Sequence, residues 1–172
     1  MSLRGRQNST TRPLQTASFL VVRVGLSYLA LPATGVRGVL TSEEAGHEQT
    51  VTEAGSVYRQ VDLARQLSIV ADLSGPEMRT VLYSTGRSQG AMAVEQVVGL
   101  IDVEPNECLP LPAQFRGDER NWFGGMMLYQ DQLVLILNPS WALGELSSAE
   151  AAPRGQVEQS MRATPVTLGE SC

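Results

Sequence analysis

Short apolar runs broken by glycine and proline fill the middle of this chain, and they constrain its fold more than any other feature. The runs at residues 19–22 and 133–137 are typical, and no stretch needs to be read as a long helix. Many short strands separated by turn residues are characteristic of small barrels or a sandwich. We therefore predict a mostly β fold with a few short helices.

The strands are predicted from apolar patterning between turn residues. Residues 19–24 are apolar almost throughout, as expected of a strand that is buried on both faces. Gly25 permits a tight turn, and a return strand over residues 26–31 is expected to stop at Pro32, which has no N–H to donate to the sheet. The remaining predicted strands cover residues 38–40, 50–53, 57–61, 79–85, 90–95, 97–103, 123–129 and 132–137.

Short helical segments are predicted at residues 33–37, 63–67 and 140–143. Asp62 and Asn138 precede the second and third of these, where their side chains are suited to accept the free N–H groups of a helix start. Gly144 supplies the stop of the last one. Residues 41–50 are polar and acidic, and they are predicted to form an exposed loop that contains His47.

The two ends of the chain differ from the middle. Residues 1–16 are polar, basic and without periodicity, and residues 144–172 are rich in Ala, Ser, Glu and Pro. Neither end carries enough apolar surface to offset the entropy lost on ordering. We therefore expect a flexible basic tail over 1–16, one folded domain over 17–143 and a flexible tail over 144–172.

The composition excludes several kinds of site. All thirteen basic residues are arginine, so no lysine is present for a phosphate-binding loop or a Schiff base. His47 is the single histidine, and the two cysteines, Cys108 and Cys172, are not expected to pair. We predict neither a metal site nor a cofactor.

Charge and hydropathy restrict the partners. A net charge of −5 argues against nucleic-acid binding, because phosphate contacts need clustered positive charge. No apolar stretch approaches the roughly 20 residues of a membrane-spanning helix. Two unpaired thiols suit a reducing compartment, and we predict a cytoplasmic protein that does not insert into membranes.

One catalytic motif does occur, at residues 86–90, which match the Gly-x-Ser-x-Gly elbow of serine hydrolases. That architecture needs a histidine after the serine, whereas His47 precedes Ser88. A β-turn built on glycine and serine explains the motif. Trp122 and Trp141 show no spacing suited to a ligand and are predicted to pack in or beside the core. We expect no enzyme.

The order of the apolar pieces resembles the CheW-like domain, the coupling module of bacterial chemotaxis. The pieces that carry the resemblance cover residues 19–24, 31–40, 61–67, 90–100, 109–115 and 123–139. The resemblance implies two five-stranded SH3-like barrels that share a hydrophobic core. It also implies a non-enzymatic scaffold or adaptor that couples the cytoplasmic tips of chemoreceptors to the regulatory domain of a CheA-type histidine kinase.

The chain departs from the family pattern just before the Val61-Asp62-Leu63 piece. Family members carry a segment like Gly-Val-x-Asn-Leu-Arg-Gly there, whereas residues 49–55 keep only Gly55 of that pattern. Ala54 stands where the family has an arginine that contacts partners. The family's proline in the following strand is replaced by Arg59 or its neighbour, and the loop between Leu40 and Val61 is shorter than usual.

Five residues are predicted to bind a partner because the family uses the corresponding surface. They are Val36, Arg37 and Val39 after the first hairpin, and Val98 and Leu100 on the middle strand of the second barrel. Packing in the core is the competing interpretation of Val39, Val98 and Leu100, because all three side chains are apolar. Arg37 is the better surface candidate, since a charged side chain is rarely buried without a partner.

Two alternative functions stay open. The first is a divergent stand-alone β-barrel regulator that has lost kinase coupling and binds another protein, which the altered segment 49–55 favours. The second is a serine hydrolase that uses Ser88.

Overall fold

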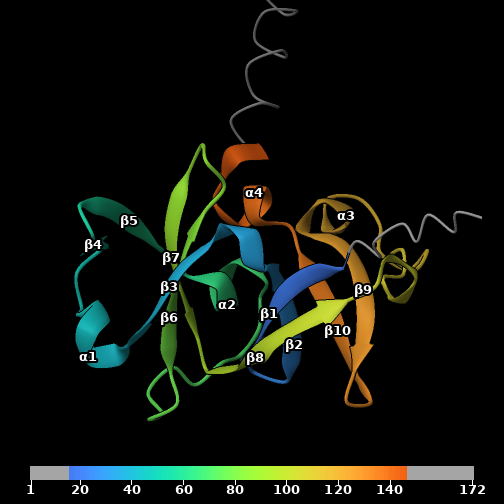
Figure 1. The fold of residues 1–172 in the computed structure, drawn as a ribbon, viewed down its shortest axis with the longest axis horizontal. Helices are drawn as coiled ribbons and strands as arrows, with labels where there is room; N and C mark the ends of the chain where they lie inside the picture. The colour runs from blue at the N-terminus through green and yellow to red at the C-terminus, as the bar shows by residue number, and fades with distance from the viewer. Residues whose placement is uncertain (1–15, 147–172) are drawn as a thin grey trace, which may run out of the picture.

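The computed structural model describes residues 16–146, which form two five-stranded sheets (Figure 1). The first sheet consists of β1 (Ala17–Val24), β2 (Ser27–Pro32), β8 (Gln96–Val103), β9 (Phe123–Tyr129) and β10 (Gln132–Leu137). The second consists of β3 (Val36–Thr41), β4 (Thr50–Glu53), β5 (Ser56–Val61), β6 (Arg79–Ser84) and β7 (Gln89–Val94). The spatial orders are β8-β1-β2-β10-β9 and β3-β6-β7-β5-β4.

Short helical segments connect the strands. They are η1 (Ala33–Gly35), α1 (Ser42–Ala45), α2 (Leu63–Gln66), η2 (Pro105–Glu107), α3 (Glu119–Trp122) and α4 (Pro139–Ala142). Between residues 16 and 146 there is no helix with the length and apolar character needed to cross a membrane. Among these residues there is no group of three or more His, Cys, Asp or Glu side chains that could hold a metal ion.

The two sheets share one topology. In each, an edge strand (β8 or β3) pairs antiparallel with the first strand of a hairpin. The second strand of that hairpin (β2 or β7) then pairs parallel with a strand of another hairpin (β10 or β5). The edge strands are exchanged, because β3 follows the β1–β2 hairpin of the first sheet and β8 follows the β6–β7 hairpin of the second.

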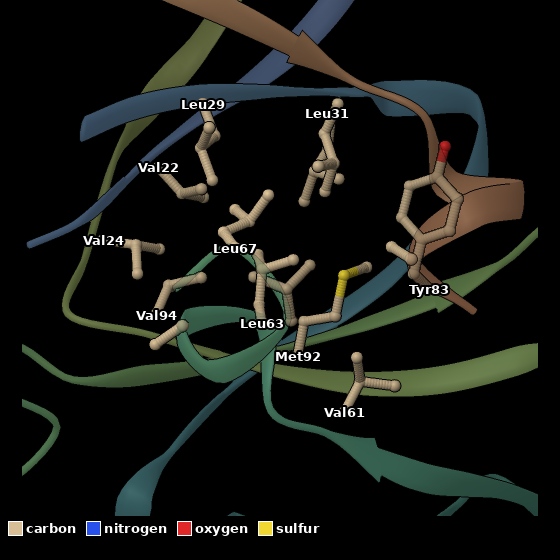
Figure 2. Packing of buried hydrophobic residues seen from close by; sticks show 14 of the residues in the cluster. Val22, Val24, Leu29, Leu31, Val61, Leu63, Leu67, Tyr83, Met92 and Val94 are labelled. Carbon is tan, nitrogen blue, oxygen red and sulfur yellow. The ribbon is translucent and has the colours of Figure 1, made fainter. Parts of the chain in front are cut away.

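Three apolar clusters account for the two-barrel architecture. One lies within the first barrel and contains Phe19, Val21 and Met127; another lies within the second and contains Val51, Tyr58 and Leu82. The third and largest cluster lies between the barrels and takes side chains from both sheets and from α2 (Figure 2). The predicted fold of two five-stranded barrels sharing a hydrophobic core is thereby confirmed.

Strand β1 supplies two of these clusters at once. Phe19 and Val21 point into the first barrel, while Leu20, Val22 and Val24 point into the shared core. Successive side chains of a strand leave on opposite faces, so a strand that is apolar throughout separates two cores. The prediction that residues 19–24 are buried on both faces is confirmed.

Several predicted boundaries need correction. Strand β2 begins at Ser27, because Leu26 lies in the turn and is fully exposed. The segment predicted as a helical turn over 33–37 is helical only to Gly35, and β3 begins at Val36. The loop predicted over 41–50 contains α1, whose start is closed by reciprocal hydrogen bonds between Thr41 and Glu44. The helical segments η2 and α3 were not predicted from the sequence.

The two predicted helix caps have different outcomes. Asp62 Oδ1 accepts from the backbone N of Arg65 at 3.0 Å, which confirms the cap of α2. Asn138 does occupy the N-cap position of α4, but its side chain makes no capping bond. Its amide nitrogen instead donates to the Asn121 carbonyl at 2.9 Å and ties α4 to α3.

The aromatic residues near α3 and α4 pack as predicted. The rings of Trp122 and Trp141 stack at 5.1 Å, and both lie partly buried against the shared core. Residues 1–15 and 147–172, and Cys172 with them, lie outside the described residues.

Candidate protein-binding surface

Strand β3 forms one edge of the second sheet and pairs only with β6. Val36 pairs with Tyr83 and Gly38 with Leu82, so Arg37 is an extra residue that forms a β-bulge. Along β3 the side chains alternate between half-buried and exposed, with Arg37 and Val39 on the exposed face. Bulges are frequent at sheet edges and beside functional sites, where they redirect a side chain.

Tyr83 anchors the connection from β2 into β3. Its hydroxyl donates to the Pro32 carbonyl at 2.8 Å, and its ring lies so close beneath Gly35 that an added Cβ would come within 2.2 Å of it. Burial raises the pKa of Tyr83 to about 12, while the positive charge of Arg37 acts in the opposite direction. These two contacts anchor the start of β3, from which Arg37 projects.

Strand β8 forms the corresponding edge of the first sheet and pairs only with β1. Val21 pairs with Gly99 and Val22 with Val97, so Val98 is the extra residue of a second bulge. Leu100 is 65% exposed. The two edge strands thus share three properties: the same place in the sheet topology, a bulge and an exposed apolar side chain.

The structure separates the five predicted residues into two groups. Arg37, Val39 and Leu100 are exposed, with Val39 at 40%. Val36 packs partly against the shared core and Val98 partly against the core of the first barrel. Core packing therefore holds for Val98 but not for Val39 or Leu100.

The predicted position of Val98 and Leu100 on the middle strand of the second barrel is wrong. Strand β8 belongs to the sheet that contains β1, and it is an edge strand there. The physical reason is that strand order in a sheet is set by partners distant in the sequence. Here β8 crosses back to β1 instead of extending the sheet of β6 and β7, the strands that precede it.

One exposed apolar pair in the first sheet was not predicted from the sequence. Leu128 on β9 and Leu133 on β10 lie directly opposite each other and are 71% and 54% exposed. Alternation along the strand places Leu128 on the opposite face of β9 from the buried Met127. Both faces of this run are apolar, so the sequence does not show which of them reaches water.

The altered segment 49–55 forms β4 and the turn into β5. Strand β4 is the other edge of the second sheet. Ala54 and Gly55 both have positive φ, at 48° and 79°, and Glu53 pairs with Ser56 across the turn. Ala54, the position of the arginine implied by the resemblance, therefore lies at the tip of an exposed two-residue turn.

Ser88 lies in the turn between β6 and β7, as the turn interpretation predicts. The Thr85 hydroxyl oxygen accepts from the backbone nitrogens of Arg87 and Ser88, and the backbone of Thr85 pairs with that of Ser88. The Thr85 hydroxyl also donates to the carboxylate of Glu145, and hydrogen bonds from Thr85, Ser140 and Ser88 lower the pKa of that carboxyl. These contacts close a turn, and none of them involves a histidine.

A family model described as the CheW-like domain matches residues 18–146, which is most of the chain. The chain belongs to the CheW-like domain family. This is a family of chemotaxis scaffolds and adaptors that are not enzymes. The two bulged edges and the shared core described above are thus features of a CheW-like domain.

Comparison with curated protein sequences gives no match. Among solved structures, the chain is similar to the scaffolding protein TtCheW from Thermoanaerobacter tengcongensis, with a TM-score of 0.62 and 13% sequence identity. The similarity covers 80% of this chain and 90% of that chain. At this identity the likeness supports the CheW fold.

Proposed function

We propose that this CheW-like protein is a cytoplasmic adaptor that couples the cytoplasmic tips of chemoreceptors to the regulatory domain of a CheA-type histidine kinase. One observation carries the proposal: each barrel of this CheW-like domain ends in a bulged edge strand with an exposed apolar side chain. Arg37 and Val39 mark the edge at β3, and Leu100 marks the edge at β8.

An edge strand is suited to this role because one side of its backbone has no partner in its own sheet. A similar barrel can add a strand there, so that main-chain hydrogen bonds give affinity and side chains give specificity. Bulges limit unselective pairing at the same edges. In this arrangement Leu100 is an apolar anchor, and Arg37 selects a partner with an acidic group.

The test is a calorimetric titration of the full chain against the regulatory domain of a CheA-type kinase encoded in the same genome. We expect micromolar binding, and Arg37→Ala or Leu100→Ala should weaken it by about fivefold or more, as for residues central to an interface. Arg120→Ala and Leu128→Ala are the matched controls. They remove an exposed arginine on α3 and an exposed leucine on β9, and neither should change the affinity.

The outcomes discriminate between proposals. Binding that is insensitive to both Arg37→Ala and Leu100→Ala contradicts the proposed surface and keeps the adaptor. A folded protein that shows no binding contradicts kinase coupling. Circular dichroism of each variant establishes that the fold is intact.

A second candidate is a stand-alone regulator that has lost kinase coupling and binds another protein. The observation that favours it is the turn at Ala54, where a methyl group stands in place of the partner-contacting arginine implied by the family resemblance. Loss of one interfacial arginine is worth a few kcal/mol if it is a hot spot. Restoring it with Ala54→Arg should create kinase binding if this candidate is correct, and should matter little if coupling already exists.

A further inference from the structure

The second barrel has a hollow of about 340 Å³ at its mouth. Its floor consists of Thr80, Ala91 and Ala93 on the neighbouring strands β6 and β7. Further lining comes from Gly46, His47, Gln60, Val61, Asp62, Leu73 and Met78. Mouths of β-barrels are a common place for small-ligand sites, and pockets of about 300 Å³ and above hold such ligands.

Small side chains create this hollow. The first barrel is filled by Phe19, Met127 and Val134, among others. In the second barrel the side chains of Ala91 and Ala93 face inward from β7, and they leave space above the sheet. Small side chains at these positions of β7 therefore leave the mouth of the second barrel open.

Thr80 places a polar group on the floor of the hollow. The residue is only 3% exposed, and it lines the hollow together with the alanines of β7.

The charges around the hollow select a positive ligand. No arginine within residues 16–146 lines it, whereas Asp62 does. Asp62 uses Oδ1 to cap α2, and its exposed side chain lies at the hollow. The remaining lining combines the polar Gln60 and His47 with the apolar Leu73 and Met78.

We propose that this hollow binds a primary ammonium group carried on a short aliphatic chain. The ammonium contacts Asp62, and the methylene chain lies against Met78 and the alanine floor. Two sources share this chemistry: a free alkylamine and a lysine side chain of a partner protein. A second copy of this chain supplies no such side chain, because the sequence contains no lysine.

The test is NMR titration of the full chain with n-hexylammonium, with hexanoate as the matched anion. We expect hexylammonium to shift the backbone amide signals of Gln60, Ala91 and Ala93, and hexanoate to leave them in place. Shifts confined to other residues, absence of shifts at millimolar hexylammonium, or equal binding of hexanoate would each overturn the proposal. Nα-acetyl-lysine N-methylamide separates the sources: tighter binding than hexylammonium supports a protein lysine, and weaker binding supports a free amine.

Two variants test the contacts. Asp62→Asn removes the charge and keeps a good N-cap, so affinity for hexylammonium should fall about two- to fivefold while the fold persists. Asp118→Asn is its control, because Asp118 precedes α3 without a capping bond and does not line the hollow. Ala93→Ile fills the floor and should abolish the shifts. Unchanged affinity in Asp62→Asn overturns the assigned contact.

Discussion

Ala54 is a single residue in a backbone conformation that its side chain disfavours. Its φ of 48° lies in the left-handed region, where the Cβ of an L-residue crowds the following carbonyl. Two-residue hairpin turns with positive φ at both positions prefer Asn-Gly. Gly55 fits that preference and Ala54 does not, so the turn between β4 and β5 is strained at one position.

Replacing Ala54 by asparagine should therefore raise the free energy of unfolding by about 0.5–1 kcal/mol. Urea denaturation monitored by circular dichroism measures the change. Ala113→Asn is the control, since Ala113 is exposed and its φ is not positive. Equal effects of the two substitutions would show that the turn is not strained.

Single residues also show why some local predictions succeed and others fail. The cap by Asp62 could be predicted because its partner, the N–H of Arg65, lies three residues away. The side chain of Asn138 finds its partner on Asn121, 17 residues away, and donates instead of accepting. An amide carries both a donor and an acceptor, so its local pattern does not decide which one is used.

The connection from β2 through η1 into β3 depends on one side chain of another strand. Tyr83 on β6 bonds to the last residue of β2 and packs under η1, which leaves room only for glycine at position 35. This contact sets where the edge strand begins. The proposed binding surface at Arg37 follows two residues later.

Alkaline pH should loosen this connection. The pKa of Tyr83 is raised from 10.0 to about 12 in the folded protein, so the folded state keeps a proton that the unfolded state releases. The stability contribution is complete below about pH 10 and declines as the pH rises toward 12. Urea denaturation of wild type and Tyr83→Phe at pH 8 and above pH 10 checks this.

The phenylalanine variant provides the contrast for that measurement. It should be less stable by about 1 kcal/mol at neutral pH because the bond to Pro32 is lost. Its stability should also fall less steeply with alkaline pH than that of wild type. Parallel pH curves for the two proteins would contradict the role given to the hydroxyl.

The elements themselves were largely predictable, and their arrangement was not. Nearly every strand follows from an apolar run between turn residues, and β1 even shows its two buried faces. The bulges at Arg37 and Val98, and the place of β8 beside β1, depend on pairing with distant strands. The candidate surface was therefore found in part from the family resemblance, while the equivalence of its two edges needed the structure.

The whole molecule is held together by the cluster between the barrels. Leu63 of α2 and Leu67, which follows that helix, lie at its centre among side chains from both sheets (Figure 2). Neither barrel buries this surface alone. Unfolding of one barrel therefore exposes the apolar face of the other, and we expect both to unfold in a single transition.

Leu63→Ala tests this cooperativity. Leu63 is completely buried, so its truncation should lower the free energy of unfolding by about 2–5 kcal/mol. The backbone amide NMR signal of Met127 reports the first barrel, and that of Ala91 reports the second. The two signals should shift to lower urea together. Separate midpoints would show that the barrels unfold independently.

The exchange of edge strands between the sheets has a consequence for synthesis of the chain. When the ribosome has made the β1–β2 hairpin, the strands that flank it, β8 and β10, do not yet exist. Ser18 in β1 bonds to Asp102, 84 residues further on. Contacts of such long sequence separation form slowly. The first strands to be synthesised must therefore wait for the last, and the N-terminal half is exposed to chaperones and proteases until the chain is almost finished.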